Sequence, residues 1–216
     1  MRFELNKNYY GDAMMYNKSI VYIYPGLTVL VGCNGIGKTT LITQLKERCN
    51  EFNIPYLDFN QVGMQSSSMM MDRMLNLDND ISGLTRMYCS SEGQKIKESL
   101  CYFGKKYMKF MNEIKSEQER IFFFFDAVDS GFSVDNVLEF KYDCVNSIIE
   151  TCKNINKEAY IIVSCNEYEM ARNENCIILP ELNYRQIKSY NTYRKIILRS
   201  RRKLNRIHGY EEFIYE

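Results

Sequence analysis

Residues 32–39, Gly-Cys-Asn-Gly-Ile-Gly-Lys-Thr, constrain the fold of this 216-residue chain more than any other segment. They match the pattern Gly-x4-Gly-Lys-Thr in full, between an apolar run at 27–31 and a helical apolar pattern at 38–52. Glycines let backbone N–H groups surround a phosphate, and the N-terminus of the helix adds positive potential. The segment therefore predicts a phosphate-binding loop, with Lys38 on the β- and γ-phosphates and the Thr39 hydroxyl on Mg²⁺.

A second anchor for Mg²⁺ is predicted at Asp126. Residues 121–125, Ile-Phe-Phe-Phe-Phe, form a continuous apolar run that is typical of a strand buried on both faces of a sheet. Asp126 ends this run, 88 residues after Lys38. A carboxylate at the end of a core strand is costly unless a cation lies nearby, so we expect Asp126 to hold Mg²⁺ directly or through water, as a Walker B aspartate does.

The order of the elements predicts an α/β fold, to which the phosphate-binding loop adds the character of a P-loop NTPase. Strands are expected at residues 2–6, 19–24, 27–31, 53–59, 121–125, 159–164 and 176–179, and helices at 38–52, 92–115 and 133–152. Pro25-Gly26 is expected to form a hairpin turn between the second and third strands. This alternation favours a mainly parallel sheet with an antiparallel N-terminal edge. We expect a nucleotide-binding domain at 1–182 and a basic, mostly helical appendage at 183–216.

The appendage carries an unbalanced charge. Residues 183–208 contain nine Lys or Arg and no acid, whereas the rest of the chain holds 19 basic and 27 acidic residues, a net charge of −8. Tyrosines at 184, 190 and 193 are interleaved with these bases, a mixture that suits contact with nucleic acid. Three roles stay open for the segment from Arg185 to Arg206: binding nucleic acid, docking on the acidic body of the chain or on an acidic partner protein, or forming a solvated helix face.

The cysteines, the single histidine and the short apolar runs exclude some classes of site and location. Eight dispersed cysteines and a single histidine, His208, disfavour a zinc site and a Ser-His-Asp hydrolase. We expect reduced cysteines, and a hard metal ion on oxygen ligands if a metal is bound. The longest apolar run is five residues and the N-terminus has no apolar leader, so we expect a cytoplasmic protein without membrane contact.

Several segments together resemble ABC-type ATPase domains, more the chromosome-maintenance and recombination-repair branch than the transporters. The loop at 32–40 is similar to that family's Gly-x-Asn-Gly-x-Gly-Lys-Thr/Ser-Thr form, Ser-Ser-Glu-Gly-Gln at 90–94 looks like its signature, and Asp-Ala-Val-Asp-Ser-Gly at 126–131 looks like Walker B with the D-loop. The resemblance implies the following nucleotide-binding residues: Gly32, Cys33, Asn34, Gly35, Ile36, Gly37, Lys38, Thr39, Thr40, Ser90, Ser91, Glu92, Gly93 and Gln94. It also implies a Q-loop role for Gln61, near Mg²⁺ and the attacking water.

Two positions depart from that family. Ala127 stands where the family has a glutamate as general base, and Asn166 stands where it has the switch histidine. Loss of a positioned base typically costs about 10²- to 10⁴-fold in rate, so we expect ATP to be bound well and hydrolysed slowly. The sequence leaves open whether Ala127 is natural or replaces a glutamate deliberately. Asp129 is a weaker candidate for a displaced base, and Tyr10 or Tyr16 for stacking on adenine.

The resemblance implies an ATP- and Mg²⁺-dependent homodimer. Two copies would enclose two nucleotides head to tail, each γ-phosphate lying between Lys38 of one subunit and the Ser91–Gly93 segment of the other, and nucleotide would act as an association switch. An ATPase is expected for a form with glutamate at position 127. Two alternatives stay open: a P-loop kinase acting on a nucleotide or small molecule, and a non-catalytic module that uses ATP as a regulatory or structural ligand.

Overall fold

The computed structural model describes residues 1–8, 15–60, 92–130 and 132–208. Its centre is a six-stranded sheet with the strand order β4-β5-β6-β3-β7-β8. The strands are β3 (Gly26–Val31), β4 (Tyr56–Asn60), β5 (Arg120–Asp126), β6 (Glu158–Ser164), β7 (Asn175–Ile178) and β8 (Asn183–Gln186). All neighbours pair in parallel except β7 and β8, which are antiparallel. A mostly parallel α/β sheet is therefore confirmed.

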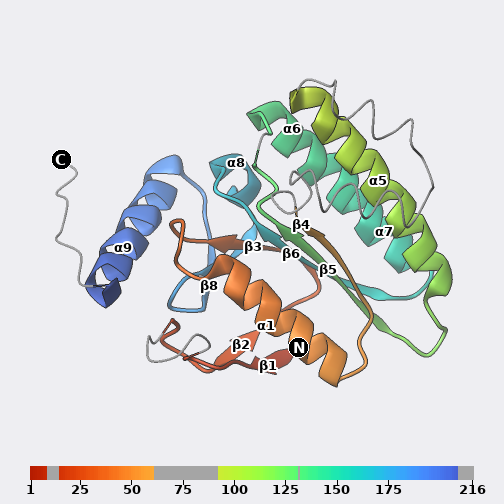
Figure 1. Ribbon diagram of the computed structural model, residues 1–216, viewed down its shortest axis with the longest axis horizontal. Helices are drawn as coiled ribbons and strands as arrows, with labels where there is room; N and C mark the ends of the chain where they lie inside the picture. The colour runs from red at the N-terminus through yellow and green to blue at the C-terminus, as the bar shows by residue number, and fades with distance from the viewer. Residues whose placement is uncertain (9–14, 61–91, 131, 209–216) are drawn as a thin grey trace.

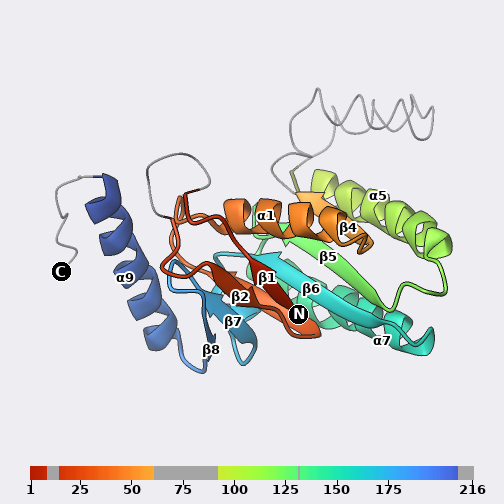
Figure 2. The same ribbon diagram turned by 90° about the horizontal axis from the view of Figure 1, so that it is seen from below.

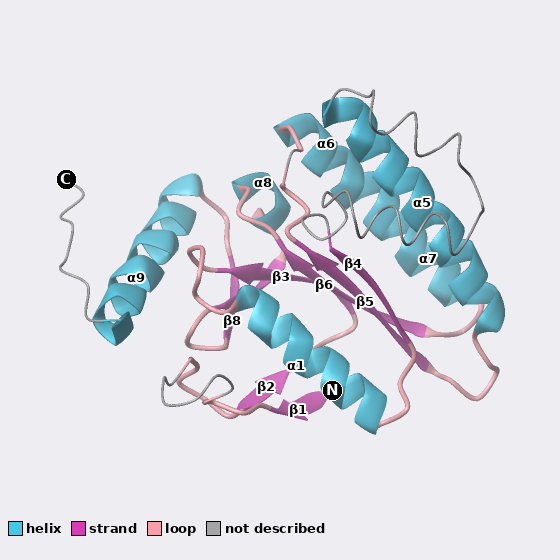
Figure 3. Cartoon of the chain, in the orientation of Figure 1, coloured by secondary structure: helices cyan, strands magenta, loops and turns pink. Residues whose placement is uncertain are grey.

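Helices cover both faces of this sheet (Figures 1 and 3). One face carries α1 (Lys38–Glu51) together with β1 (Arg2–Glu4) and β2 (Ile20–Tyr22). The other carries α5 (Glu92–Glu113) and a continuous helical segment made of α6 (Val134–Glu139), the π-helix η1 (Phe140–Val145) and α7 (Asn146–Asn154). The short α8 (Tyr168–Ala171) follows β6.

The apolar run of β5 supplies both cores because successive strand residues point to opposite faces. Phe123 and Phe125 pack with the helical layer of α5 and α7, whereas Phe122 and Phe124 pack beneath α1 and the N-terminal strands. All four phenylalanines are buried, with at most 1% of their surface exposed. This double burial explains why the run shows no alternation of polar and apolar residues.

The antiparallel N-terminal strands are present, but the predicted hairpin at Pro25-Gly26 is wrong. β2 pairs with β1 in a separate two-stranded sheet, and β3 pairs in parallel with β6 and β7. Both edges of β3 are thus occupied within the large sheet, so no edge is left for β2. The apolar residues Val29, Leu30 and Val31 of β3 are fully buried.

The basic C-terminal segment begins as a strand and continues as a helix. Residues 183–186 form β8 at the edge of the central sheet, and α9 covers Tyr190–His208. Figures 1 and 2 place α9 at one end of the molecule, beside the loop between β3 and α1. The helical character of the tail is confirmed, while its first residues belong to the sheet.

The part of the chain described here contains no helix long and apolar enough to cross a bilayer. The six cysteines whose side chains are described are free thiols. Burial raises the pKa of the Cys49 thiol to about 12, which keeps that group protonated at neutral pH. The described cysteines behave as small apolar side chains, as expected.

Candidate nucleotide site

The loop from Gly32 to Thr39 connects β3 to the first turn of α1, as the pattern predicts. Gly35 and Gly37 have φ angles of 83° and 100°, in the left-handed region that favours glycine. Gly37 is the residue before the helix, and its carbonyl accepts the first bond of α1 from Leu41 N at 2.9 Å. The glycines therefore give the loop a backbone path that side chains with a Cβ would strain.

Tyr16 supports this loop from below. Its ring is fully buried, and its hydroxyl donates to the Gly37 carbonyl at 2.8 Å. The suggestion that Tyr16 stacks on adenine is therefore wrong, because the ring has no exposed face to offer a base. Tyr10, the other aromatic considered for that role, lies outside the described residues.

Lys38 is buried, with 8% of its surface exposed, and all its protons are engaged. Its Nζ donates to Gly32 O at 2.8 Å, to Cys33 O at 3.3 Å and to Asn166 Oδ1 at 2.9 Å. Among the described residues it forms no ion pair with a carboxylate. Burial lowers the pKa of Lys38, an effect that the nearby carboxylates of Asp129 and Asp126 offset only in part. A phosphate would supply the countercharge that the lysine lacks.

Asp126 ends β5 where the sequence predicts and is 5% exposed. Its Oδ2 accepts a long hydrogen bond from Asn60 Nδ2 at 3.4 Å, and its Oδ1 is buried without a partner in the described structure. Asn60 and Asp126 are aligned because they end the neighbouring parallel strands β4 and β5. An orphaned carboxylate oxygen costs free energy unless a cation or water satisfies it.

The oxygen donors fit the predicted magnesium ion. Thr39 and Asp126 line the same cavity, and a hydroxyl with a carboxylate are hard oxygen ligands of the kind that Mg²⁺ takes alongside phosphate oxygens and water. When bound, Mg²⁺ would neutralise developing charge on the phosphates. Among the described residues, the Oδ1 atoms of Asp126 and Asp129 are both buried without a hydrogen-bond partner, but only Asp126 lines the cavity, so its Oδ1 argues for a cation there.

Ala127 also lines the cavity, immediately after Asp126. Its φ angle is 53°, an unusual value for a residue with a Cβ, and its carbonyl accepts from Ser130 N at 3.0 Å in the turn that follows β5. The methyl group has no proton-accepting atom. The position predicted for a general base is thus beside the cavity and chemically inert.

Asn166 connects three parts of the site. Its Oδ1 accepts from Lys38, its backbone N–H donates to Asp129 Oδ2 at 3.0 Å, and its carbonyl accepts from the Tyr193 hydroxyl on α9. Asp129 is therefore held as an acceptor for the backbone after β6. It is not among the residues that line the cavity, which weakens its candidacy as a displaced base.

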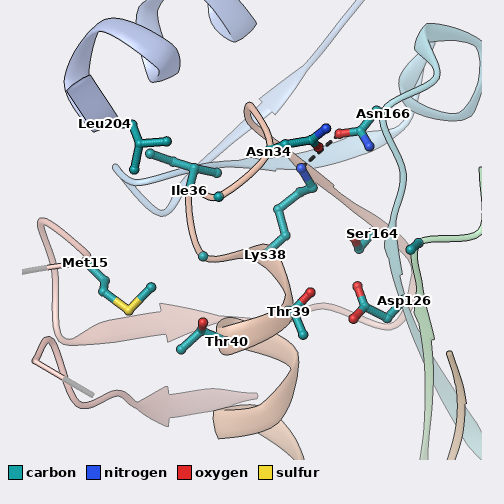
Figure 4. A pocket seen from close by; sticks show the side chains of 13 residues that line it. Met15, Asn34, Ile36, Lys38, Thr39, Thr40, Asp126, Ser164, Asn166 and Leu204 are labelled. Atoms are coloured by element: carbon teal, nitrogen blue, oxygen red, sulfur yellow. Dashed lines mark hydrogen bonds between the residues drawn. The ribbon is translucent and has the colours of Figure 1, made fainter. Parts of the chain in front are cut away.

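These residues surround a cavity of about 530 Å³ at the carboxyl ends of β3, β5 and β6. This is where open α/β sheets bind ligands. In Figure 4, Asp126, Ser164 and Asn166 lie on one side of Lys38, and the apolar Met15 and Leu204 lie on the other. The polar side suits phosphates and metal, and the apolar side suits a base.

Sequence reasoning missed the contribution of α9. Ser200 on this helix is buried, and its Oγ accepts from Cys33 N in the phosphate loop at 2.8 Å. Leu204, one turn further on, lines the cavity beside Gly35. No local sequence pattern predicts the contact between Ser200 and Cys33, because the two residues are 167 positions apart. Asn60 could have been found, as the residue after a predicted strand parallel to that of Asp126.

The other predicted residues are placed as follows. The loop and helix residues that line the cavity besides Lys38 and Thr39 are Asn34, Gly35, Ile36, Gly37 and Thr40. Gly32 and Cys33 contribute their carbonyls to Lys38. Gln61, Ser90 and Ser91 lie outside the described residues. Glu92, Gly93 and Gln94 form the start of α5, and the side chains of these three residues are not described.

A comparison with sequence families matches residues 28–177 to the family described as ATPase family associated with various cellular activities (AAA). The chain belongs to the AAA ATPase family. Membership makes it a P-loop ATPase domain that binds ATP, typically with Mg²⁺, in agreement with the phosphate loop and Asp126. The match runs from β3 to β7 and so includes Lys38, Asp126 and Asn166, but neither β1 and β2 nor α9. A comparison with curated proteins finds no match.

Proposed function

We propose that this AAA-family chain binds ATP·Mg²⁺ in the cavity around Lys38 and uses the nucleotide as an association switch. The observation that carries the proposal is that two buried charges line one cavity and that, among the described residues, the Lys38 ammonium has no carboxylate partner and the Asp126 Oδ1 has no hydrogen-bond partner. The triphosphate would accept hydrogen bonds from Lys38 and the loop amides, and Thr39 with Asp126 would hold the metal.

Hydrolysis is proposed to be slow in this chain. Proton transfer from the attacking water needs an acceptor within hydrogen-bond reach, and Ala127 provides none. Asn166 can orient a water or a γ-phosphate oxygen through its amide, but an amide is not a base. ATP would therefore stay bound long enough to favour an associated state.

The associated state that we propose is a head-to-tail homodimer of the kind seen in ABC-type ATPases. Asn34, Gly35 and Thr39 at the rim of the phosphate loop are exposed, so a second subunit could cover a bound nucleotide there. The segment at 90–94 would supply the covering residues, and α5 begins within it at Glu92. This arrangement follows from the sequence resemblance, and the open rim supports it.

Nucleic acid is the partner that we propose for the switch. The nine basic residues at 183–208, with no acid among them, give the C-terminal segment the charge that a phosphate backbone attracts. A solvated helix face would not need so uniform a sign.

The test is the solution mass of the protein by analytical ultracentrifugation, with and without ATP·Mg²⁺, for wild type, Lys38→Ala and Ala127→Glu. We expect an ATP-dependent dimer in wild type and none in Lys38→Ala. Ala127→Glu should turn ATP over at least tenfold faster and return to monomer as ATP is consumed. A wild type that binds ATP but stays monomeric would contradict the dimer switch and favour a kinase or a partner-dependent module.

A further inference from the structure

Helix α9 contacts the nucleotide site through one face. Tyr193, Ser200 and Leu204 are spaced seven and four residues apart, which puts them on the same side of a helix. Tyr193 donates to Asn166 O, Ser200 accepts from Cys33 N, and Leu204 lines the cavity. Tyr193 and Ser200 are buried, with 6% and 2% of their surfaces exposed.

Two residues are held by Lys38 on one side and by α9 on the other. Cys33 gives its carbonyl to Lys38 and its N–H to Ser200. Asn166 gives its Oδ1 to Lys38 and its carbonyl to Tyr193. A triphosphate that takes over the hydrogen bonds of Lys38 would therefore remove one hydrogen bond from each of the two residues that contact α9.

The opposite face of α9 carries a row of cations. Lys195, Arg199, Arg202 and Arg206, here called the basic stripe, are spaced four, three and four residues apart and are all exposed. At 1.5 Å per residue the stripe is about 16 Å long, the axial length of about five nucleotides of one B-form strand. Figure 2 shows α9 at the end of the molecule, with one side turned away from the sheet.

The chemistry of the stripe favours nucleic acid over an acidic protein. Three of its four residues are arginines, whose planar guanidinium groups match phosphate oxygens in pairs. Tyr190, at the start of the same helix, is 59% exposed, but its ring packs against Tyr168 and Tyr193 on the other side of α9 and so is not part of the stripe. The regular row of exposed cations alone matches a repeating phosphate backbone.

We propose that the basic stripe binds the phosphate backbone of nucleic acid, and that this binding is coupled to nucleotide binding through the contacts of Tyr193 and Ser200. The coupling rests on the proposed function, because it requires ATP in the cavity around Lys38. It is reciprocal: a change in oligonucleotide affinity caused by ATP must equal the change in ATP affinity caused by the oligonucleotide.

The surface is tested with a fluorescein-labelled 30-nucleotide oligothymidylate, by anisotropy over a series of salt concentrations. The triple variant Arg199→Gln, Arg202→Gln, Arg206→Gln should bind at least tenfold more weakly, and the slope of log affinity against log salt should fall by about two. Removing the same charge elsewhere, with Arg2→Gln, Lys109→Gln and Lys153→Gln, should change affinity less than twofold. Equal loss in both triples, or equally tight binding of polyglutamate by wild type, would overturn the nucleic-acid assignment.

The coupling is tested by repeating the titration with and without ATP·Mg²⁺. Wild type should show at least a fivefold change in the Kd for the oligonucleotide, and the Kd for ATP should change by the same factor when the oligonucleotide is present. Tyr193→Phe and Ser200→Ala keep the stripe, so they should bind oligonucleotide normally without ATP but lose the change. An unaltered ATP effect in both variants, with circular dichroism showing native folding, would overturn the coupling.

The two claims fail separately. A wild type that binds oligothymidylate through the stripe but shows no heat on titration with ATP·Mg²⁺ would contradict the proposed function and the coupling, and leave the surface standing. A wild type that binds ATP with equal affinity in the presence and absence of bound oligonucleotide would contradict the coupling alone.

Discussion

Two buried lysines, Lys38 and Lys141, have different partners, and the difference separates a lysine that can bind an anion from one that stabilises the fold. Lys141, in the π-helix η1, is 4% exposed; its Nζ donates to Glu169 O at 3.0 Å and Arg172 O at 2.8 Å and lies 3.0 Å from Glu174 Oε1. Lys38 is also buried, with 8% of its surface exposed, but its Nζ donates to two backbone carbonyls and an amide oxygen. The carboxylate completes the environment of Lys141. Lys38 has no such carboxylate among the described residues, and it lines a cavity with room for an anion.

The largest effect on stability is expected at the lysine with the complete environment. Replacing Lys141 with methionine leaves Glu174, the Glu169 carbonyl in α8 and the Arg172 carbonyl just after it without their donor. This should lower the free energy of unfolding by about 3 kcal/mol. For a chain of this size that is roughly a 6–12 °C fall in Tm, measured by differential scanning calorimetry. A fall of less than 2 °C would remove the distinction between the two lysines.

Replacing Lys38 with methionine should change the free energy of unfolding of the nucleotide-free protein by no more than about 1 kcal/mol. Three hydrogen bonds are lost, but the cost of burying an ammonium without a carboxylate disappears with them. Urea unfolding of the two methionine variants side by side measures the difference. A loss as large as that of Lys141→Met would mean that Lys38 is part of the scaffold.

Asp126→Asn, like Lys38→Met, should change the free energy of unfolding of the nucleotide-free protein only slightly. The substitution removes a buried negative charge whose Oδ1 has no partner among the described residues, so the nucleotide-free protein should gain up to about 1 kcal/mol. The variant should also lose the dependence of ATP affinity on Mg²⁺. Calorimetric titration of ATP with Mg²⁺ and with EDTA tests this, and an unchanged magnesium effect would place the metal elsewhere.

The smallest effect is a pH dependence at Lys38. Its pKa is lowered in the folded protein, so between that value and the ordinary lysine value of 10.5 the unfolded chain binds more protons than the folded one. The free energy of unfolding of wild type therefore rises with pH in that window, relative to Lys38→Met. Below the window the folded protein carries the full cost of burying a charged ammonium. Urea midpoints from pH 7 to 10.5 measure the difference; parallel curves for the two proteins would contradict it.

Local patterns predicted the phosphate end of the site because its residues are adjacent in sequence or end adjacent strands. Gly32 to Thr39 adopt the predicted loop, and Asp126 ends the apolar strand that the run at 121–125 indicates. Such features depend on backbone geometry and burial within a few residues, and local sequence patterns predict both.

The rest depends on tertiary contacts that no spacing encodes. The contact of Ser200 with Cys33 and that of Tyr193 with Asn166 exist because β8 returns the chain along β7 and delivers α9 beside the phosphate loop. The turn signal at Pro25-Gly26 misled for the same reason: it reports a local bend, whereas the partners of β3 are set by a fully buried position in a parallel sheet.

The central claim is that Lys38 binds the phosphates of ATP, whereas Lys141 stabilises the fold. Isothermal titration of ATP·Mg²⁺ into wild type, Lys38→Met and Lys141→Met, each at a temperature where it is folded, tests this most directly. We predict one site per chain in wild type, affinity within threefold of wild type in Lys141→Met, and at least a hundredfold loss in Lys38→Met. Equal ATP affinity in wild type and Lys38→Met would contradict the account.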